Sequence, residues 1–156
     1  MDKKFTKNKY HFGICKEFEF QAEMDIKYQL QLENLNNTNK FSIVDFKITN
    51  INAYIELKSR TCKSTAFATT LFDKAKVDRW CRNNLFKDAV IFIAFAFQDG
   101  SHYFIKYNDL LFDSFEKTLV EEWNQINYNI PLSKCISTSD FINEINELKS
   151  NSAHVN

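Results

Sequence analysis

The spacing of apolar residues along the chain predicts several strands of one sheet. Apolar residues alternate with polar ones, or run together, over residues 41–48, 52–59 and 89–97, and each segment has the length of a strand. Asp99-Gly100 is typical of a tight hairpin turn, so residues 102–107 are expected to pair with 89–97. The run over 89–97 is apolar throughout, which predicts a central strand that is buried on both faces.

Helices are predicted between and after these strands. Thr70 suits the N-cap of a helix over 71–83, residues 108–117 favour a short helix, and an amphipathic helix follows a capping residue at Ser139. Residues 16–32 are less uniform, because their first part favours a helix whereas their later part alternates as a strand does. The chain therefore interleaves the two kinds of element, as an α/β fold does.

Composition narrows the class of protein. The 156 residues are 44% hydrophobic and 26% charged, which predicts one soluble globular domain over residues 1–150 and a frayed tail over 151–156. The longest apolar run is too short to span a bilayer, and the N-terminus lacks the apolar stretch of a signal peptide, so no membrane contact is expected. The four cysteines have no zinc-site spacing, which favours reduced thiols in the cytoplasm or nucleus. Sixteen Phe with two Gly and one Pro indicate an A/T-rich coding sequence, which suits a virus or an A/T-rich microbe.

The charge is uneven although its net value is zero. Between residues 56 and 87 the chain has eight basic and three acidic residues, whereas acidic residues dominate from 109 to 122. A basic segment of this kind suits contact with a phosphate backbone. The alternative is a solvated helix face without a ligand.

Two carboxylates and a lysine form the strongest chemical signal. Side chains two residues apart on a strand point the same way, so Glu56 and Lys58 would lie side by side while Ile55 and Leu57 face a core. Asp45 ends the preceding apolar run, and its carboxylate would approach that of Glu56 if the two strands pair. Two hard oxygen ligands beside a lysine suit metal-dependent cleavage of a phosphodiester. The same tripeptide is also common on half-exposed strands, where it is only a solvated face.

The residues around this cluster resemble a known superfamily of nucleases. Val44-Asp45, ten intervening residues and Glu56-Leu57-Lys58 are similar to the PD-(D/E)XK signature, with Val44 in place of the proline that names it. The likeness covers about residues 20–112 and is closest to a small stand-alone branch that is common in phages and large DNA viruses. It implies an α/β fold with a restriction-endonuclease-like core, in which helices flank a central mixed β-sheet.

The resemblance also implies roles for particular residues. Asp45, Glu56 and the backbone carbonyl of Leu57 would hold Mg²⁺, with Mn²⁺ as a substitute, and Lys58 would complete the catalytic set. The first helix of this superfamily often supplies one more acid, for which Glu19 and Glu23 are the candidates. An exposed acid without a role is the alternative for both. Contacts to phosphate or DNA are expected from four further residues, namely Arg60, Thr70, Lys74 and Lys76.

Three functions are compatible with the sequence. The first is a Mg²⁺-dependent DNA endonuclease, a hydrolase that acts on phosphodiester bonds. The second is a catalytically silent nuclease-fold protein that binds DNA or serves as a subunit of a larger viral assembly. The third is an interaction domain in which the motif arose by chance, which the neutral charge and the acidic, aromatic last third favour. The intact set of Asp45, Glu56 and Lys58 favours the first, with DNA as the partner and a homodimer as one way to cut both strands.

Overall fold

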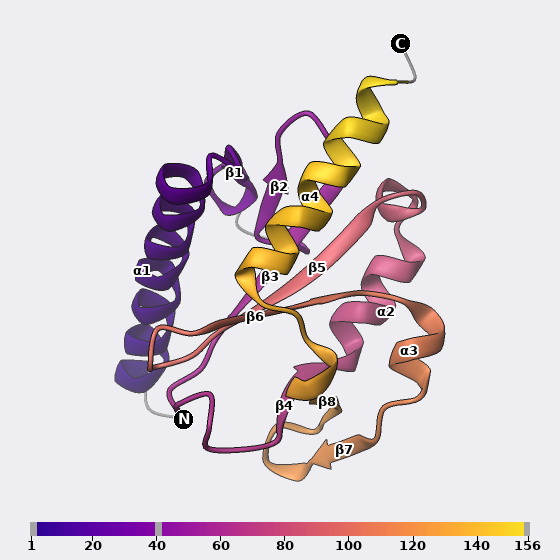
Figure 1. Ribbon diagram of the computed structural model, residues 1–156. Coiled ribbons are helices and arrows are strands. Elements are labelled where there is room, and N and C mark those ends of the chain that lie inside the picture. The colour runs from indigo at the N-terminus through magenta and orange to yellow at the C-terminus, as the bar shows by residue number, and fades with distance from the viewer. Residues whose placement is uncertain (1–2, 40–41, 155–156) are drawn as a thin grey trace.

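The chain folds around a five-stranded sheet in a computed structural model that describes residues 3–39 and 42–154 (Figure 1). The strands of this sheet span Leu32–Asn34 (β1), Phe46–Ile48 (β2), Ala53–Ser59 (β3), Val90–Ala96 (β5) and His102–Lys106 (β6). They are ordered β1-β2-β3-β5-β6. β3 pairs antiparallel with β2 and parallel with β5, so the sheet is mixed.

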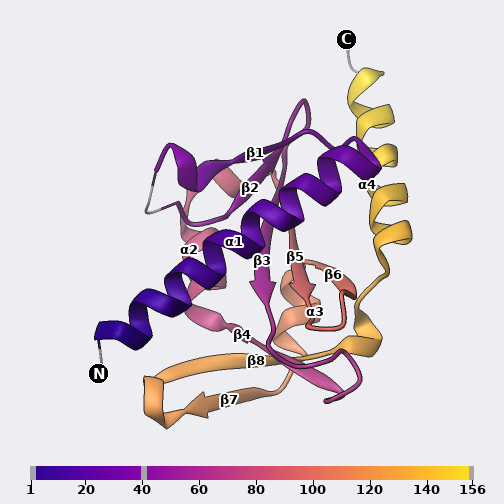
Figure 2. The ribbon, with the colours of Figure 1, turned by 90° about the vertical axis from the view of Figure 1, so that its left-hand side faces the viewer.

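Helices and a second, smaller sheet cover the two faces of the central sheet (Figures 1 and 2). The helices are Lys3–Tyr28 (α1), Lys74–Arg82 (α2), Asp109–Asp113 (α3) and Thr138–Ala153 (α4). The small sheet has the order β4-β8-β7, with β4 at Thr69–Asp73, β7 at Lys117–Val120 and β8 at Gln125–Pro131. α1 and α4 pack on one face of the central sheet, whereas α2 and the small sheet lie on the other. The predicted α/β architecture, a mixed central sheet flanked by helices, is confirmed.

β3 lies at the centre of the sheet and contributes to both cores. Ile55 and Leu57 face the core under α1 and α4, whereas Tyr54 faces the core under α2 with Phe72 and Trp80. Glu56 points to the same side as Tyr54, yet it is only 1% exposed. A carboxylate in such surroundings needs a partner or a ligand, because burying an unpaired charge is very costly.

α1 resolves the two alternatives for residues 16–32 in favour of a helix that ends at Tyr28. Gln29 and Gln31 adopt left-handed backbone angles, with φ of 56° and 57°, and turn the chain into β1. The apolar and polar alternation in this stretch therefore falls on the end of α1 and on the turn over residues 29–31, and only its last residue, Leu32, lies in a strand. Although α1 has 26 residues, neither it nor any other helix within the described residues is long and apolar enough to cross a membrane.

The helix predicted to begin after Thr70 begins three residues later. Residues Thr69–Asp73 form β4, which pairs with β8, and the N-cap of α2 is Asp73, whose side chain accepts a hydrogen bond from the Ala75 amide at 2.9 Å. The prediction of Thr70 as the cap was wrong. Its neighbours favour a strand once a pairing partner is present, and that partner lies more than 50 residues further along the chain.

The other predicted elements differ from the structure mainly in their ends. The hairpin at Asp99-Gly100 is confirmed, with Gly100 at a φ of 82° between β5 and β6. The strand predicted over 41–48 shortens to β2, and residue 41 lies outside the described residues. α4 is capped by Ser137 instead of Ser139 and continues to Ala153, beyond the point where fraying was predicted to begin.

Candidate functional site

Asp45 and Glu56 come together because β2 and β3 are adjacent. Phe46 pairs with Ile55, so Asp45, one residue before β2, lies next to the stretch of β3 that carries Glu56. The Asp45 Oδ2 atom accepts a hydrogen bond from the Leu57 amide at 2.8 Å, and its Oδ1 atom accepts one from Asn36 Nδ2 at 2.9 Å. These two bonds fix the carboxylate at the end of the β2–β3 ladder.

α2 holds the same region from the other side. The Trp80 indole donates a hydrogen bond to the carbonyl of Ile43 at 2.9 Å, and thereby holds the segment that leads to Asp45. Trp80 itself is buried against Phe72 of β4, with ring centroids 5.6 Å apart. The loop before β2 is therefore held in place by a helix that also carries a charged residue of the site.

That residue is Lys76, which lies against the buried carboxylate of Glu56. Its ammonium group forms an ion pair with Glu56 Oε1, and Lys58 Nζ lies 3.5 Å from the same oxygen. Lys58 also lies over the ring of Phe72, 5.7 Å from its centroid. Among the described residues, Glu56 Oε2 is buried without a hydrogen-bond partner. An oxygen of this kind is unusual in a folded protein, which makes Glu56 a candidate functional residue.

Burial dominates the electrostatics of the site. It raises the pKa of Glu56 to about 7, with a further contribution from Asp45, while Lys76 and Lys58 act in the opposite direction. Burial also lowers the pKa of Lys58, although the nearby Glu56 partly offsets this effect. Because burial disfavours the ionised form of Glu56, a divalent cation beside the carboxylate would stabilise that form.

An acidic side chain of α1 reaches this cluster, and it is Glu17. Its two carboxylate oxygens accept hydrogen bonds from Asn36 Nδ2 at 3.3 and 3.4 Å, and the same nitrogen also bonds to Asp45. Burial, followed by the charge of Asp45, raises the pKa of Glu17. Glu17 precedes the buried Phe20 and Met24 by three and seven residues, so helical spacing places it on the inward face of α1.

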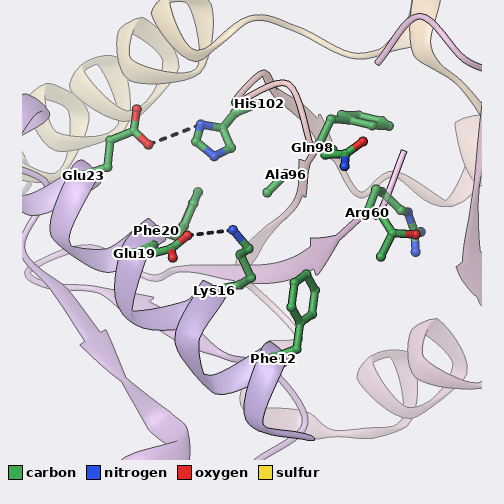
Figure 3. A pocket seen from close by; sticks show the side chains of 12 residues that line it. Phe12, Lys16, Glu19, Phe20, Glu23, Arg60, Ala96, Gln98 and His102 are labelled. Carbon is green, nitrogen blue, oxygen red and sulfur yellow. Dashed lines mark hydrogen bonds and ion pairs between the residues drawn. The ribbon is translucent and has the colours of Figure 1, made fainter. Parts of the chain in front are cut away.

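The two acids predicted from the sequence lie elsewhere on α1. Glu19 pairs with Lys16 at 2.8 Å, and Glu23 lies 3.6 Å from His102 on β6 (Figure 3). Both line a cleft of about 300 Å³ between α1 and the β5–β6 hairpin, with Arg60 across from them. The structure thus brings Asp45, Glu56 and Lys58 together and adds Glu17, whereas Glu19 and Glu23 face this neighbouring cleft.

The four residues expected to contact phosphate separate into three kinds. Lys76 is part of the cluster. Arg60 donates to the Thr70 hydroxyl at 2.8 Å and to the Leu71 carbonyl, so Arg60 and Thr70 join the end of β3 to β4. Lys74 pairs with Asp78 at 2.8 Å on the solvent side of α2. Only Lys76 of these four contacts an acidic residue of the site.

The carboxylate oxygens of Asp45 and Glu56 are of the chemical type that Mg²⁺ binds in proteins. Within the part of the chain that the structure describes, no three His, Cys, Asp or Glu side chains form a complete metal site. Mg²⁺ commonly takes only one or two protein carboxylates and keeps several waters. Asp45 and the unpartnered oxygen of Glu56 meet this requirement. The Leu57 carbonyl points to the same edge as its amide, towards Asp45, beyond the last β2–β3 pair.

Comparisons with known proteins give no relative for this chain. No family model matches it, and no curated protein or solved structure does so either. Function can therefore be inferred only from the residues and their arrangement.

Proposed function

We propose that this protein is a metal-dependent nuclease that hydrolyses phosphodiester bonds of DNA at Asp45, Glu56 and Lys58. One observation carries the proposal: a fully buried carboxylate with one unpartnered oxygen lies beside a second acid and two lysines. A purely structural ion pair would be expected to satisfy both oxygens of a buried carboxylate, because an unsatisfied one is costly.

The order of elements supports a restriction-endonuclease-like core. α1 is followed by the antiparallel strands β1, β2 and β3, then by α2 and by β5, which is parallel to β3. β4 interrupts this order but pairs in the second sheet. The resemblance to PD-(D/E)XK nucleases implies the order helix-strand-strand-helix-strand, which α1, β2, β3, α2 and β5 follow, with Asp45 one residue before β2 and with Glu56 and Lys58 on β3.

The residues of the cluster fit a Mg²⁺ site. Asp45, Glu56 and the Leu57 carbonyl would hold the ion, and Mn²⁺ would bind the same hard oxygen ligands. When bound, the ion lowers the pKa of a water and offsets negative charge on the scissile phosphate. It also supplies the positive charge that the buried Glu56 carboxylate needs.

The two lysines have distinct tasks in this proposal. Lys58 is 31% exposed, so its ammonium group can donate a hydrogen bond to a phosphate oxygen or orient the attacking water. Lys76 is 21% exposed, and its positive charge favours the ionised form of Glu56 against the effect of burial. The phosphate would then lie between the lysines and the acidic pair.

A specific observation also favours the catalytically silent alternative. Lys76 already contacts one oxygen of Glu56, so part of the charge that a metal would supply comes from the protein itself. If this contact persisted, the protein would bind DNA through its basic residues without cutting it. Cleavage and metal affinity distinguish the two proposals, because the silent protein would show neither metal-dependent cutting nor tight binding of Mn²⁺.

The direct test is cleavage of labelled single-stranded, duplex and branched DNA with Mg²⁺ or Mn²⁺. Lys58→Ala is the test variant, and Lys106→Ala is the matched control, because it removes a lysine that pairs with Glu144 of α4 outside the site. We expect metal-dependent cutting by the parent and by Lys106→Ala, and its loss in Lys58→Ala with Mn²⁺ affinity retained. Cutting that persists in Lys58→Ala would reveal a contaminant and contradict the proposal.

A further inference from the structure

A second hollow lies beside the site, next to Arg60 and the loop that follows it. Its volume is about 340 Å³, at the lower end of the range for small-ligand sites, so it suits one small planar group. We call it the Phe67 hollow, and its main lining residues are Arg60, Cys62, Phe67, Thr69, Leu71 and Phe97. Among the described lining residues there is no carboxylate, in contrast to the cleft that contains Glu19 and Glu23.

Phe67 is an exposed aromatic ring on a loop that is held at several points. The side chain is 68% exposed. The loop over residues 61–68 is anchored by hydrogen bonds from the Gln98 amide to the Cys62 carbonyl and from the Ser64 amide and hydroxyl to Asp99, all at 2.7–2.9 Å. An exposed aromatic ring that lines a largely apolar hollow, on an anchored loop, is suited to stacking on another planar group.

The hollow is cationic and close to the proposed reaction site. Arg60 follows Lys58 by two residues, just beyond the end of β3 at Ser59, which corresponds to roughly 7 Å along an extended chain. Lys58 lies over the ring of Phe72 and Arg60 over that of Phe95, so both side chains lie on the side of the sheet that faces α2. The Arg60 guanidinium is oriented by the Thr70 hydroxyl and the Leu71 carbonyl. It has five N–H donors, of which these contacts use two. A strand with a phosphate at Lys58 therefore has its next nucleotide within reach of the hollow.

We propose that the Phe67 hollow receives the base of an unpaired nucleotide, so that the substrate is a nucleic-acid strand with a single-stranded segment at the cleaved bond. This inference rests on the proposed function, since it places the scissile phosphate at Lys58. Stacking on Phe67 tolerates any base, because every base has a π-face. A paired base does not enter, because its faces are covered by its neighbours in the duplex. Charge complementarity favours this occupant over an apolar peptide side chain, since Arg60 lines the hollow, Lys58 is two residues away, and both would attract the phosphates on either side of a base.

Binding without cleavage tests the inference. Fluorescence anisotropy in EDTA would compare a labelled single-stranded oligonucleotide, a blunt duplex of the same sequence and that duplex with an unpaired tail. The variants are Phe67→Ala, Phe67→Leu and Phe67→Trp. Leu85→Ala is the control, because Leu85 is 63% exposed but precedes β5, at the opposite end of the sheet from Arg60.

We expect Phe67→Ala and Phe67→Leu to weaken binding of the single strand and the tailed duplex by about tenfold. Phe67→Trp should bind the single strand and the tailed duplex as tightly as the parent does. Affinity for the blunt duplex should be the same in all Phe67 variants, and Leu85→Ala should bind all three ligands as the parent does. Equal loss on all three ligands, no loss on the single strand, or no single-strand binding by the parent would overturn the inference. Because this assay involves no metal and no cutting, a parent that binds through Phe67 but never cleaves would refute the nuclease and leave the hollow standing. If the parent cleaved DNA and substitution of Phe67 left binding unchanged, the inference about the Phe67 hollow would be refuted and the nuclease proposal would stand.

Discussion

Two lysines of α2, Lys74 and Lys76, each form an ion pair with a carboxylate, but the two pairs differ in their surroundings. Lys74 pairs with Asp78 at 2.8 Å, where the side chains are 32% and 44% exposed. Lys76 pairs with Glu56, whose side chain is 1% exposed. The first pair joins neighbouring turns of one helix, whereas the second joins α2 to the central strand.

This difference shows how burial turns an ordinary ion pair into a candidate site. A solvent-facing pair contributes about 0–1 kcal/mol to stability, and water satisfies its remaining polar atoms. The buried pair leaves Glu56 Oε2 without a partner among the described residues, and the pKa of the carboxyl group rises to about 7. The same residue types therefore form an ordinary helix-surface pair in one place and a buried pair with an unpartnered carboxylate oxygen in the other.

The largest expected effect is on metal binding and cleavage. Asp45→Asn keeps the size of the side chain and an acceptor for the Leu57 amide, but it removes one of the two charges that face the proposed ion. We expect Mn²⁺ affinity, measured by calorimetry, to fall at least about tenfold and the cleavage rate at least about a hundredfold. Asp78→Asn, which changes only the solvent-facing pair, should match the parent. Equal Mn²⁺ affinity in Asp45→Asn and the parent would refute the site assignment.

The second effect is on stability and compares the lysines directly. Lys76→Met leaves Glu56 buried with only Lys58 nearby, so at pH 8 the free energy of unfolding should fall by about 3 kcal/mol. Lys74→Met should lower it by less than about 1 kcal/mol. Urea denaturation measures both values. At pH 5 the loss in Lys76→Met should shrink, since Glu56 is then mostly protonated. A loss independent of pH would mean that Lys76 acts through packing and not through Glu56.

The third effect is the pH dependence of stability that Glu56 causes. Its pKa in the folded protein, about 7, lies above the ordinary value of 4.5, so the folded state binds the proton more tightly than the unfolded state. Stability is therefore highest below pH 4.5 for this group and declines as the pH rises towards and through 7. Relative to Glu56→Gln, the parent should lose up to about 3 kcal/mol between pH 4.5 and pH 8. Denaturation of both proteins across this range measures the difference, and saturating Mg²⁺ should reduce it at pH 8. A constant difference would show that Glu56 is not proton-linked to folding.

Local patterns predicted the central strands and the hairpin, because these depend on the alternation of β3, the apolar run of β5 and the Asp99-Gly100 turn. They did not predict β4, β7 and β8. Thr69–Asp73 forms a strand only because Gln125–Pro131 lies beside it, and such a long-range pairing leaves no local pattern. The same pairing moved the start of α2 from the predicted position to Lys74.

The residues of the candidate site likewise divide into those that local patterns predict and those that depend on long-range packing. Asp45, Glu56 and Lys58 were predictable, because two adjacent strands and the alternation of side chains bring them together. Arg60 and Thr70 were expected at the phosphate, yet they bond to each other, which depends on the unpredicted β4. The contact of Lys76 with Glu56 depends on how α2 packs against the sheet, which sequence spacing does not contain.

Glu17 offers the most specific test, since the Asn36 side chain links it to Asp45. Its carboxylate shares the Asn36 side-chain amide with Asp45, and the charge of Asp45 contributes to its raised pKa. Glu17→Gln should therefore weaken Mn²⁺ affinity by about tenfold, because one negative charge near the ion is lost. The melting temperature should stay the same or rise, because the repulsion between Glu17 and Asp45 is removed.

Glu19→Gln should change neither quantity, since Glu19 pairs with Lys16 at the neighbouring cleft. If Glu17→Gln lowered the melting temperature and left Mn²⁺ affinity unchanged, Glu17 would be part of the scaffold that holds Asn36 and not of the cation site. If Glu17→Gln instead weakened Mn²⁺ binding and raised the melting temperature, the charge of Glu17 would contribute to cation binding while it destabilises the fold.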